Sequence, residues 1–171
     1  MNQHDLEVNR QQYLTFLLRD ECFGISIDTV REIIEYGQLT TVPLMPDFVK
    51  GVINLRGDIV PVIDLSVRLG RSALELKKRT CIIILEIPFE GQLAVIGAAV
   101  DSVSEVLEID KDQIEAPPSF GARLKAQFIQ GVVNIEQSFV VLLHGDKVLS
   151  IEELASLIEN VKPQKGRGEN V

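Results

Sequence analysis

Short apolar stretches separated by polar turns recur along this chain. The clearest pair covers residues 51–55 and 59–65, joined by Arg56-Gly57-Asp58. Runs of this length, rich in Val and Ile and separated by a Gly-containing turn, are typical of a β-hairpin. Pro61 cannot donate a hydrogen bond to a β-ladder, so we expect the second run at a sheet edge, a barrel rim or a bulge.

The same pattern predicts two further hairpins and a core built from aliphatic residues. These hairpins pair residues 13–18 with 22–27, and residues 81–87 with 93–99. Aromatic residues make up only 5% of the chain and Trp is absent, so the core must come from Val, Ile and Leu. That composition favours strands. Within the central hairpin we expect Leu55 and Ile63 to be buried.

Helical periodicity is limited to short segments. Ile27, Val30 and Ile34 stand at i, i+3 and i+7, which predicts a two-turn helix over residues 27–35 with Asp28 as its N-cap. Further helices are predicted at residues 66–69 and 150–159. The last 12 residues, 160–171, are polar and rich in Gly and Lys, and are predicted to be disordered.

The second half of the chain repeats the first. Residues 100–108 (VDSVSEVLE) match residues 27–35 (IDTVREIIE), with Asp101 lying 73 positions after Asp28. Residues 131–143 align without a gap on 51–63, an offset of 80. Two matching segments in the same order indicate an internal repeat.

Each copy of the repeat offers about five short strands, enough to close a small barrel. We therefore predict a mainly β fold of two five-stranded β-barrels packed side by side, with short helices and a C-terminal helix. The lobes should cover approximately residues 20–70 and 80–145, and an exchange of strands between them stays open.

Charge and hydropathy narrow the classes of function. The net charge of −8 and the pI of about 4.8 disfavour nucleic-acid binding and attraction to an anionic membrane surface. No apolar run approaches the ~20 residues of a spanning helix, and no direct membrane insertion is expected. The first residues lack the layout of a signal peptide, which predicts a cytoplasmic protein.

Candidate chemistry is sparse. His4 and His144 have no ligand-spaced neighbours, and Cys22 and Cys81 stand alone inside apolar runs. The chain contains no Gly-rich phosphate loop and no Ser or Cys with a nearby His. We therefore expect no cofactor, no metal site and no catalytic residue, although a site assembled across the fold would escape this search.

The segment GVINLRGDIVPVIDL, preceded by VPLMPDFVK and FGISIDTVREII, resembles the CheW-type coupling (adaptor) proteins of bacterial chemotaxis. The resemblance covers roughly residues 12–159. It implies two SH3-like five-stranded β-barrels without catalytic activity. It also implies an adaptor between the cytoplasmic tip of methyl-accepting chemotaxis receptors and the regulatory domain of a CheA-type histidine kinase, recruited to membrane-associated receptor arrays.

The resemblance also implies partner-binding positions. Those matching the first barrel's coupling surface are Val30, Glu32, Asn54, Arg56 and Gly57. Those matching the apolar surface offered to the receptor tip are Ile82, Val103 and Val106. Because an amphipathic stripe usually points inward, the three valines could equally be core residues, and Asn54 could serve only to satisfy strand-end amides.

Arg56 invites a role beyond scaffolding, because Glu136 takes its place in the second copy. A barrel therefore does not require a cation there. We predict a surface ion pair between Arg56 and Glu32, presented to a partner. Two other classes of function stay open: a small-molecule sensor using an apolar cleft between the barrels, and an enzyme of unrecognised type.

Overall fold

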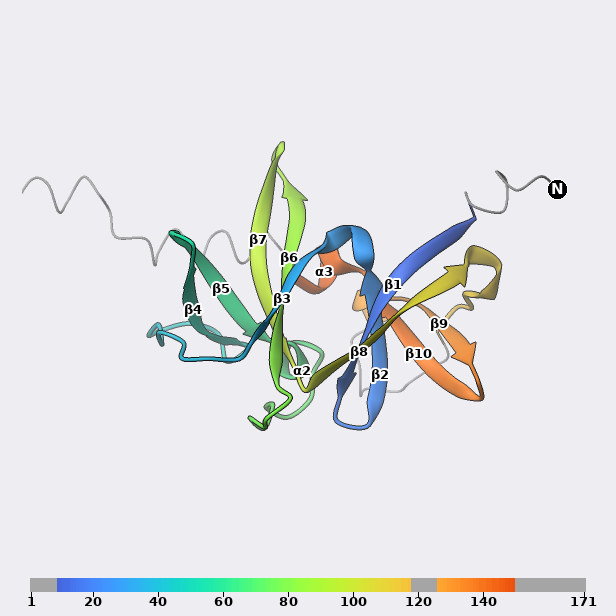
Figure 1. Cartoon of the computed structure of the whole chain (residues 1–171), viewed down its shortest axis with the longest axis horizontal. Helices are drawn as coiled ribbons and strands as arrows, with labels where there is room; N and C mark the ends of the chain where they lie inside the picture. Colours follow the sequence, from blue (N-terminus) through green and yellow to red (C-terminus); the bar gives the residue numbers. More distant parts are fainter. Residues whose placement is uncertain (1–8, 118–125, 150–171) are drawn as a thin grey trace, which may run out of the picture.

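A computed structural model describes residues 9–117 and 126–149, and it confirms a mainly β fold (Figure 1). The strands form two five-stranded sheets. Sheet A has the order β8 (Ser102–Asp110), β1 (Arg10–Leu18), β2 (Glu21–Ser26), β10 (Ser138–Leu143), β9 (Ile129–Ile135). Sheet B has the order β3 (Val30–Glu35), β6 (Cys81–Phe89), β7 (Gln92–Val100), β5 (Asp58–Asp64), β4 (Val49–Leu55).

The two sheets share one topology. In sheet B, β5 runs parallel to β7 and every other pair is antiparallel; in sheet A, β10 runs parallel to β2 in the same way. Strands β3, β4 and β5 correspond to β8, β9 and β10, and the N-terminal hairpin β1–β2 completes sheet A. Each sheet thus takes strands from both ranges, 20–70 and 80–145, that the repeat suggested for the lobes.

The helices are short. They are η1 (Ile27–Thr29), α2 (Leu65–Arg68), η2 (Lys111–Gln113), η3 (Ala126–Phe128) and α3 (Gly145–Leu149). The helical turn predicted at residues 66–69 is confirmed by α2, whose first turn is capped by Asp64. The predicted helix at residues 150–159 and the predicted disordered tail lie outside the described residues.

The helix predicted over residues 27–35 is wrong. Only Ile27–Thr29 is helical, and Val30–Glu35 is an edge strand of sheet B that pairs with β6. Partly buried and exposed residues alternate along β3 with a period of two, so its apolar residues serve a strand. β-branched residues favour this outcome when a neighbouring strand is available.

Asp28 is not the N-cap that the sequence suggested. The cap of η1 is Ser26, whose hydroxyl accepts a hydrogen bond from the Asp28 backbone amide at 3.3 Å. The matching Asp101 instead accepts a hydrogen bond from the backbone amide of Arg19, in the turn between β1 and β2. The Asp28 carboxylate accepts a hydrogen bond from the Gln11 side chain of β1 at 3.4 Å, so neither acidic side chain caps a helix.

The predicted closed barrels are open, curled sheets that retain SH3-like packing. In each sheet, one isolated bridge joins the segment that follows one edge strand to the opposite edge strand. Thr40, after β3, pairs with Val52 of β4, and Glu115, after β8, pairs with Val132 of β9. A glycine precedes each bridged valine. A Cβ on Gly51 would lie 2.5 Å from the Thr40 carbonyl oxygen, so only glycine permits this approach.

Pro61 lies in β5, an interior strand rather than an edge strand. Its pairing is nevertheless one-sided, because Pro61 faces Val52 of β4 while the pairing of β5 with β7 begins only at Val62. The missing amide donor therefore costs no ladder bond on the β7 side.

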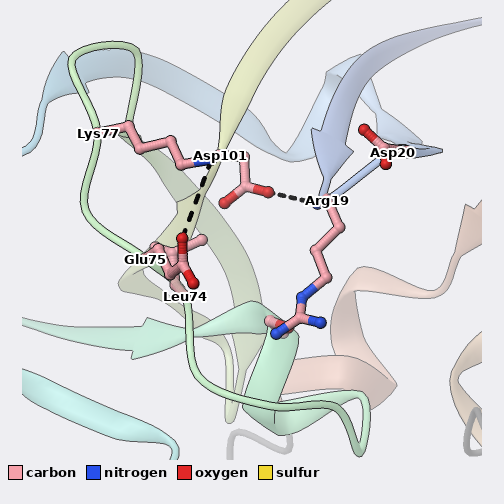
Figure 2. A pocket seen from close by; sticks show the side chains of 7 residues that line it. Arg19, Asp20, Leu74, Glu75, Lys77 and Asp101 are labelled. Carbon is pink, nitrogen blue, oxygen red and sulfur yellow. Dashed lines mark hydrogen bonds and ion pairs between the residues drawn. The ribbon is translucent and has the colours of Figure 1, made fainter.

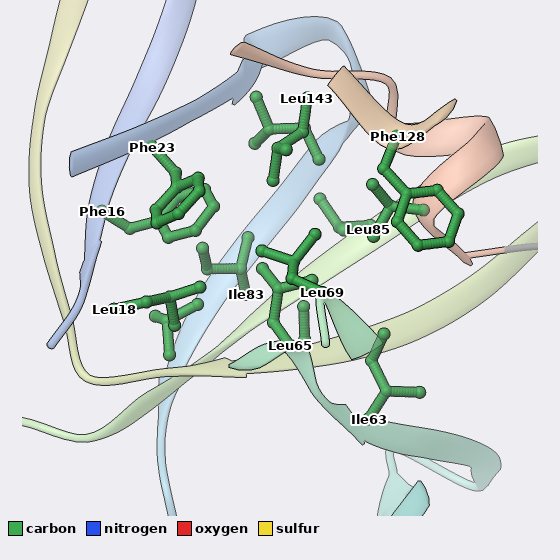
Figure 3. Packing of buried hydrophobic residues seen from close by; sticks show 14 of the residues in the cluster. Phe16, Leu18, Phe23, Ile63, Leu65, Leu69, Ile83, Leu85, Phe128 and Leu143 are labelled. Atoms are coloured by element: carbon green, nitrogen blue, oxygen red, sulfur yellow. The ribbon is translucent and has the colours of Figure 1, made fainter. Parts of the chain in front are cut away.

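The main core lies between the two sheets (Figure 3). It combines Phe16 and Phe23 of sheet A with aliphatic residues of both sheets, including Ile63, which is fully buried as predicted. Each sheet also has a smaller cluster of its own. Leu55 packs against the sheet B cluster but is only partly buried, so it is a less complete core residue than expected.

Candidate functional site

The turn between β4 and β5 holds three of the expected partner-binding residues in fixed positions. Arg56 and Gly57 both have positive φ, 51° and 93°, as the two central residues of a type I′ hairpin turn do. The side-chain oxygen of Asn54 accepts a hydrogen bond from the Gly57 amide at 2.8 Å. This bond orients the turn and places Arg56 at its tip.

The ion pair predicted between Arg56 and Glu32 is confirmed. Arg56 Nη2 lies 2.5 Å from Glu32 Oε2, and the Arg56 side chain is 60% exposed. Glu32 belongs to β3 at the opposite edge of sheet B, so the contact joins elements at the two ends of the strand order. Arg31 extends the group by pairing with Glu86 at 3.3 Å.

The pair has a clear electrostatic signature. The hydrogen bond from Arg56 and its positive charge lower the pKa of Glu32, while the same contact raises the pKa of Arg56. Hydrogen bonding and an opposite charge both favour the ionised forms. Both charges therefore persist at neutral pH, on a surface whose geometry is set by the turn and by β3.

The second copy carries the same turn with different charges. Glu136 and Gln137 occupy the tip with φ values of 47° and 68°, so the backbone conformation is preserved. At the positions matching Arg56 and Glu32 stand Glu136 and Glu105. Two carboxylates cannot form the ion pair, which shows that the fold does not depend on it.

The valines expected to contact partners divide into two groups. Val30 and Val103 occupy matching places in β3 and β8, and both pack, partly buried, against the core between the sheets. Val106, in β8, is 47% exposed. Among these three, Val106 has the most apolar surface available to a partner.

Ile82 lies elsewhere. Its side chain is fully buried in the cluster on sheet B, with Val62, Leu74 and Ile84. The expectation that Ile82 lines an open apolar surface is therefore not met, because its side chain has no exposed area to offer.

Two further exposed apolar residues on the strands of sheet B lie outside the set expected from the sequence. Ile33 follows Glu32 in β3 and is 45% exposed; Ile59 lies directly opposite Asn54 in the hairpin and is 50% exposed. Their counterparts in the second copy, Val106 and Phe139, are also exposed. Comparison of the two copies could have revealed them, because both copies keep an apolar residue at a solvent-facing strand position.

A polar hollow of about 280 Å³ lies where the β1–β2 turn meets the segment after α2 (Figure 2). Arg19, Lys77, Glu75 and Asp101 line it with charges of both signs. Lys77 pairs with Glu75 at 4.0 Å, and the Arg19 amide donates to Asp101. The Arg19 guanidinium donates instead to the Ser72 hydroxyl. The hollow lacks the mostly apolar lining typical of a ligand pocket.

The apolar space between the sheets is too small for a ligand. It measures about 10 Å³ and is surrounded by core residues such as Phe16, Ile83 and Leu143, whereas ligand pockets span ~300–1,000 Å³. The inter-barrel cleft of the sensor hypothesis is therefore filled by the core, and that hypothesis is not favoured.

The described residues contain neither a metal-binding cluster nor a helix that could span a membrane. Within 9–117 and 126–149, no group of three or more His, Cys, Asp or Glu side chains is arranged to hold a metal ion. The helices in the same ranges include none with the length and hydropathy to cross a membrane.

Comparison with known proteins gives a consistent family relationship. The CheW-like domain model matches residues 12–153. The Chemotaxis protein CheW of Klebsiella aerogenes is 40% identical over 151 residues, 88% of each chain, and that of Rhizobium meliloti is 34% identical over 143 residues, 84% of this chain and 90% of its own. The crystal structure of the scaffolding protein TtCheW from Thermoanaerobacter tengcongensis superposes with a TM-score of 0.70 at 35% identity, covering 79% of this chain and 84% of that one.

Proposed function

Because this chain belongs to the CheW-like domain family, we propose that it is a non-catalytic adaptor in bacterial chemosensory signalling. In finer detail, it couples the cytoplasmic tips of methyl-accepting chemotaxis receptors to the regulatory domain of a CheA-type histidine kinase. It would act in the cytoplasm and be recruited to membrane-associated receptor arrays. The observation that carries the proposal is the family match, which extends over residues 12–153.

The surface around Arg56 is our proposed kinase-coupling site. It presents a charged pair whose members are held by the turn and by β3, and Ile59, which pairs with Asn54 in the same hairpin, is 50% exposed. Arg is enriched among residues that dominate interface energetics, and apolar neighbours that exclude water strengthen such contacts. A pre-formed pair also loses little side-chain entropy when a partner binds. Asn54 and Gly57 would act indirectly, by fixing the turn.

The outer part of β8 is our proposed receptor-contacting site. Val106 offers exposed apolar surface there, and Val103 lies next to the core between the sheets. An exposed apolar residue on an edge strand suits the apolar face of a helical partner. Val30 occupies the matching place in β3, and Ile82 would contribute only by supporting the sheet.

A binding experiment tests the proposal. The full-length protein is titrated by calorimetry with a receptor signalling fragment and, separately, with the regulatory domain of the kinase. We expect saturable binding to both, with Arg56→Ala weakening kinase binding and Val106→Asp weakening receptor binding. Phe139→Asp serves as a matched control, because Phe139 is the exposed counterpart of Ile59 in the second copy. Absence of binding to both partners would contradict the proposal.

A further inference from the structure

The two copies of the repeat carry the same small motif at the end of each hairpin. In the first copy, the Asp64 amide donates to the Phe48 carbonyl at 2.6 Å; in the second, the His144 amide donates to the Phe128 carbonyl at 2.9 Å. His144 and Phe128 lie 80 positions after Asp64 and Phe48, the offset that aligns the hairpins. A short helix follows in each copy, α2 in the first and α3 in the second.

These two motifs meet at Arg68. Arg68 and Val148 occupy matching positions, 80 residues apart, and Arg68 Nε donates to the Val148 carbonyl oxygen at 2.7 Å. The guanidinium carbon lies 4.6 Å from the centre of the Phe48 ring and 5.0 Å from that of the Phe128 ring. Arg68 is thus bonded to its own counterpart and lies between two rings that are also counterparts, where matching segments of the two copies meet.

The contact is asymmetric because only one copy supplies a cation. Arg68 is 8% exposed and Val148 is 1% exposed. A buried cation requires compensation, and two ring faces and a carbonyl oxygen supply part of it here. An arginine in place of Val148 would put two like charges side by side in a buried position, so the apolar counterpart leaves room for a single guanidinium between the copies.

We infer that Arg68 is a positioning residue that fixes η3 and α3 of the second copy against α2 of the first. Its consequence for signalling rests on the proposed function. Arg68 belongs to neither proposed partner surface, yet it joins the sheet that carries Arg56 to the sheet that carries Val106. A bridging adaptor transmits a change from one partner to the other only if the two surfaces keep a defined geometry.

Hydrogen exchange tests the placement. In Arg68→Met, we expect the amides of His144 and Val148 to exchange at least about tenfold faster relative to the Asp64 amide than in the wild type, because η3 and α3 lose their tether. Arg10→Met is the matched control. It removes an arginine whose ion-pair partner at 3.2 Å, Asp110, belongs to the same sheet, so no contact between the two sheets is lost. An unchanged exchange ratio in Arg68→Met would overturn the inference.

Arg68→Lys distinguishes the effect of the guanidinium geometry from that of the positive charge. The same hydrogen-exchange ratio is measured in this variant, which replaces Arg68→Met if that protein does not fold. Lysine keeps the charge but lacks the planar guanidinium and the Nε donor, so we expect its exchange ratio to rise as in Arg68→Met. Exchange identical to the wild type in Arg68→Lys would show that the guanidinium geometry is not required, and the inference would fall.

A functional measurement distinguishes positioning from simple loss of stability. In both Arg68 variants we expect each partner, titrated alone, to bind within about twofold of the wild type, while receptor control of kinase activity falls about fivefold or more. If a variant with a raised hydrogen-exchange ratio kept full receptor control of kinase activity, the signalling role of Arg68 would be contradicted. If the wild type binds neither partner, the proposed function fails, while the exchange comparison still decides the placement of Arg68.

Discussion

The β4–β5 hairpin and the β9–β10 hairpin are two versions of one structure with opposite chemistry at the tip. Both have two positive-φ residues in the turn. Both have a glycine beneath an isolated bridge, Gly51 and Gly131. The first, however, presents Arg56 bonded to Glu32, whereas glutamates occupy both matching positions in the second.

This difference distinguishes the residues that the fold requires from those that can vary on its surface. Features that the backbone requires, such as room for a bridging strand and a turn of fixed twist, are kept in both copies. The charge at the tip is free to change, because the tip is exposed and neither turn needs a cation for its conformation. The ion pair is thus a feature of one copy's surface, which is where we place the proposed kinase contact.

The largest effect should come from the shared core. Ile63→Ala and its counterpart Leu143→Ala each remove a side chain buried between the sheets, and each should cost about 2–5 kcal/mol of unfolding free energy. Leu55→Ala should cost less, because Leu55 is only partly buried. Urea unfolding measures all three. A cost for Ile63→Ala below about 1 kcal/mol would show that the shared core is not packed as described.

A smaller loss of stability is expected on replacing Gly51 or Gly131 by alanine, and the loss should differ between the two copies. A Cβ on Gly131 would lie 2.4 Å from Ile114 Cγ2, and overpacking of this kind costs about 1–3 kcal/mol. A Cβ at either position would also approach a backbone oxygen, that of Thr40 at 2.5 Å or that of Glu115 at 2.8 Å. Gly51→Ala should cost more than Gly131→Ala, because only Gly51 of the two has a positive φ, 155°, which strains a residue with a side chain. Thermal unfolding of the two variants gives the order; equal melting temperatures would break this part of the comparison.

The smallest effect on stability is expected at the ion pair. Arg56→Met should shift the melting temperature by less than about 2–4 °C, because exposed pairs contribute little. The pKa of Glu32 is lowered in the folded state, so any stability from the pair is present above the ordinary glutamate pKa and is lost as the pH falls through the lowered value.

Titration followed by NMR tests the origin of that shift. In Arg56→Met the pKa of Glu32 should rise towards its ordinary value. In the second copy, Glu136→Arg should recreate the pair, which would be seen as a change in the NMR signals of the Glu105 side chain. If Glu105 does not respond, the two tips are less alike in side-chain geometry than in backbone.

Much of this structure could be predicted from local patterns, and the failures have physical causes. The three sequence-predicted hairpins and α2 follow from apolar runs and turn residues. Ile27, Val30 and Ile34 fit a period of 3.6, which favours a helix over residues 27–35, whereas pairing with β6 makes most of this segment an edge strand. Periodicity alone does not reveal whether a neighbouring strand is available.

The candidate site was predictable to a similar degree. The Arg56–Glu32 pair follows from the expectation that the segment carrying Glu32 and the hairpin turn carrying Arg56 lie at comparable places in one barrel. The pair forms, although Glu32 lies in strand β3 and not in a helical turn. The burial of Ile82 and the contact of Arg68 with Val148 were not predictable, because both depend on how the sheets curl and meet.

The most direct test of the central claim is receptor-controlled kinase activity in a reconstituted system, measured with the wild type, Arg56→Ala and Glu136→Ala, alongside thermal unfolding of each protein. We expect Arg56→Ala to keep a nearly unchanged melting temperature and to abolish receptor control, while Glu136→Ala retains both. Intact control in Arg56→Ala, or early unfolding of that variant, would contradict the claim that Arg56 serves a partner surface and not the scaffold.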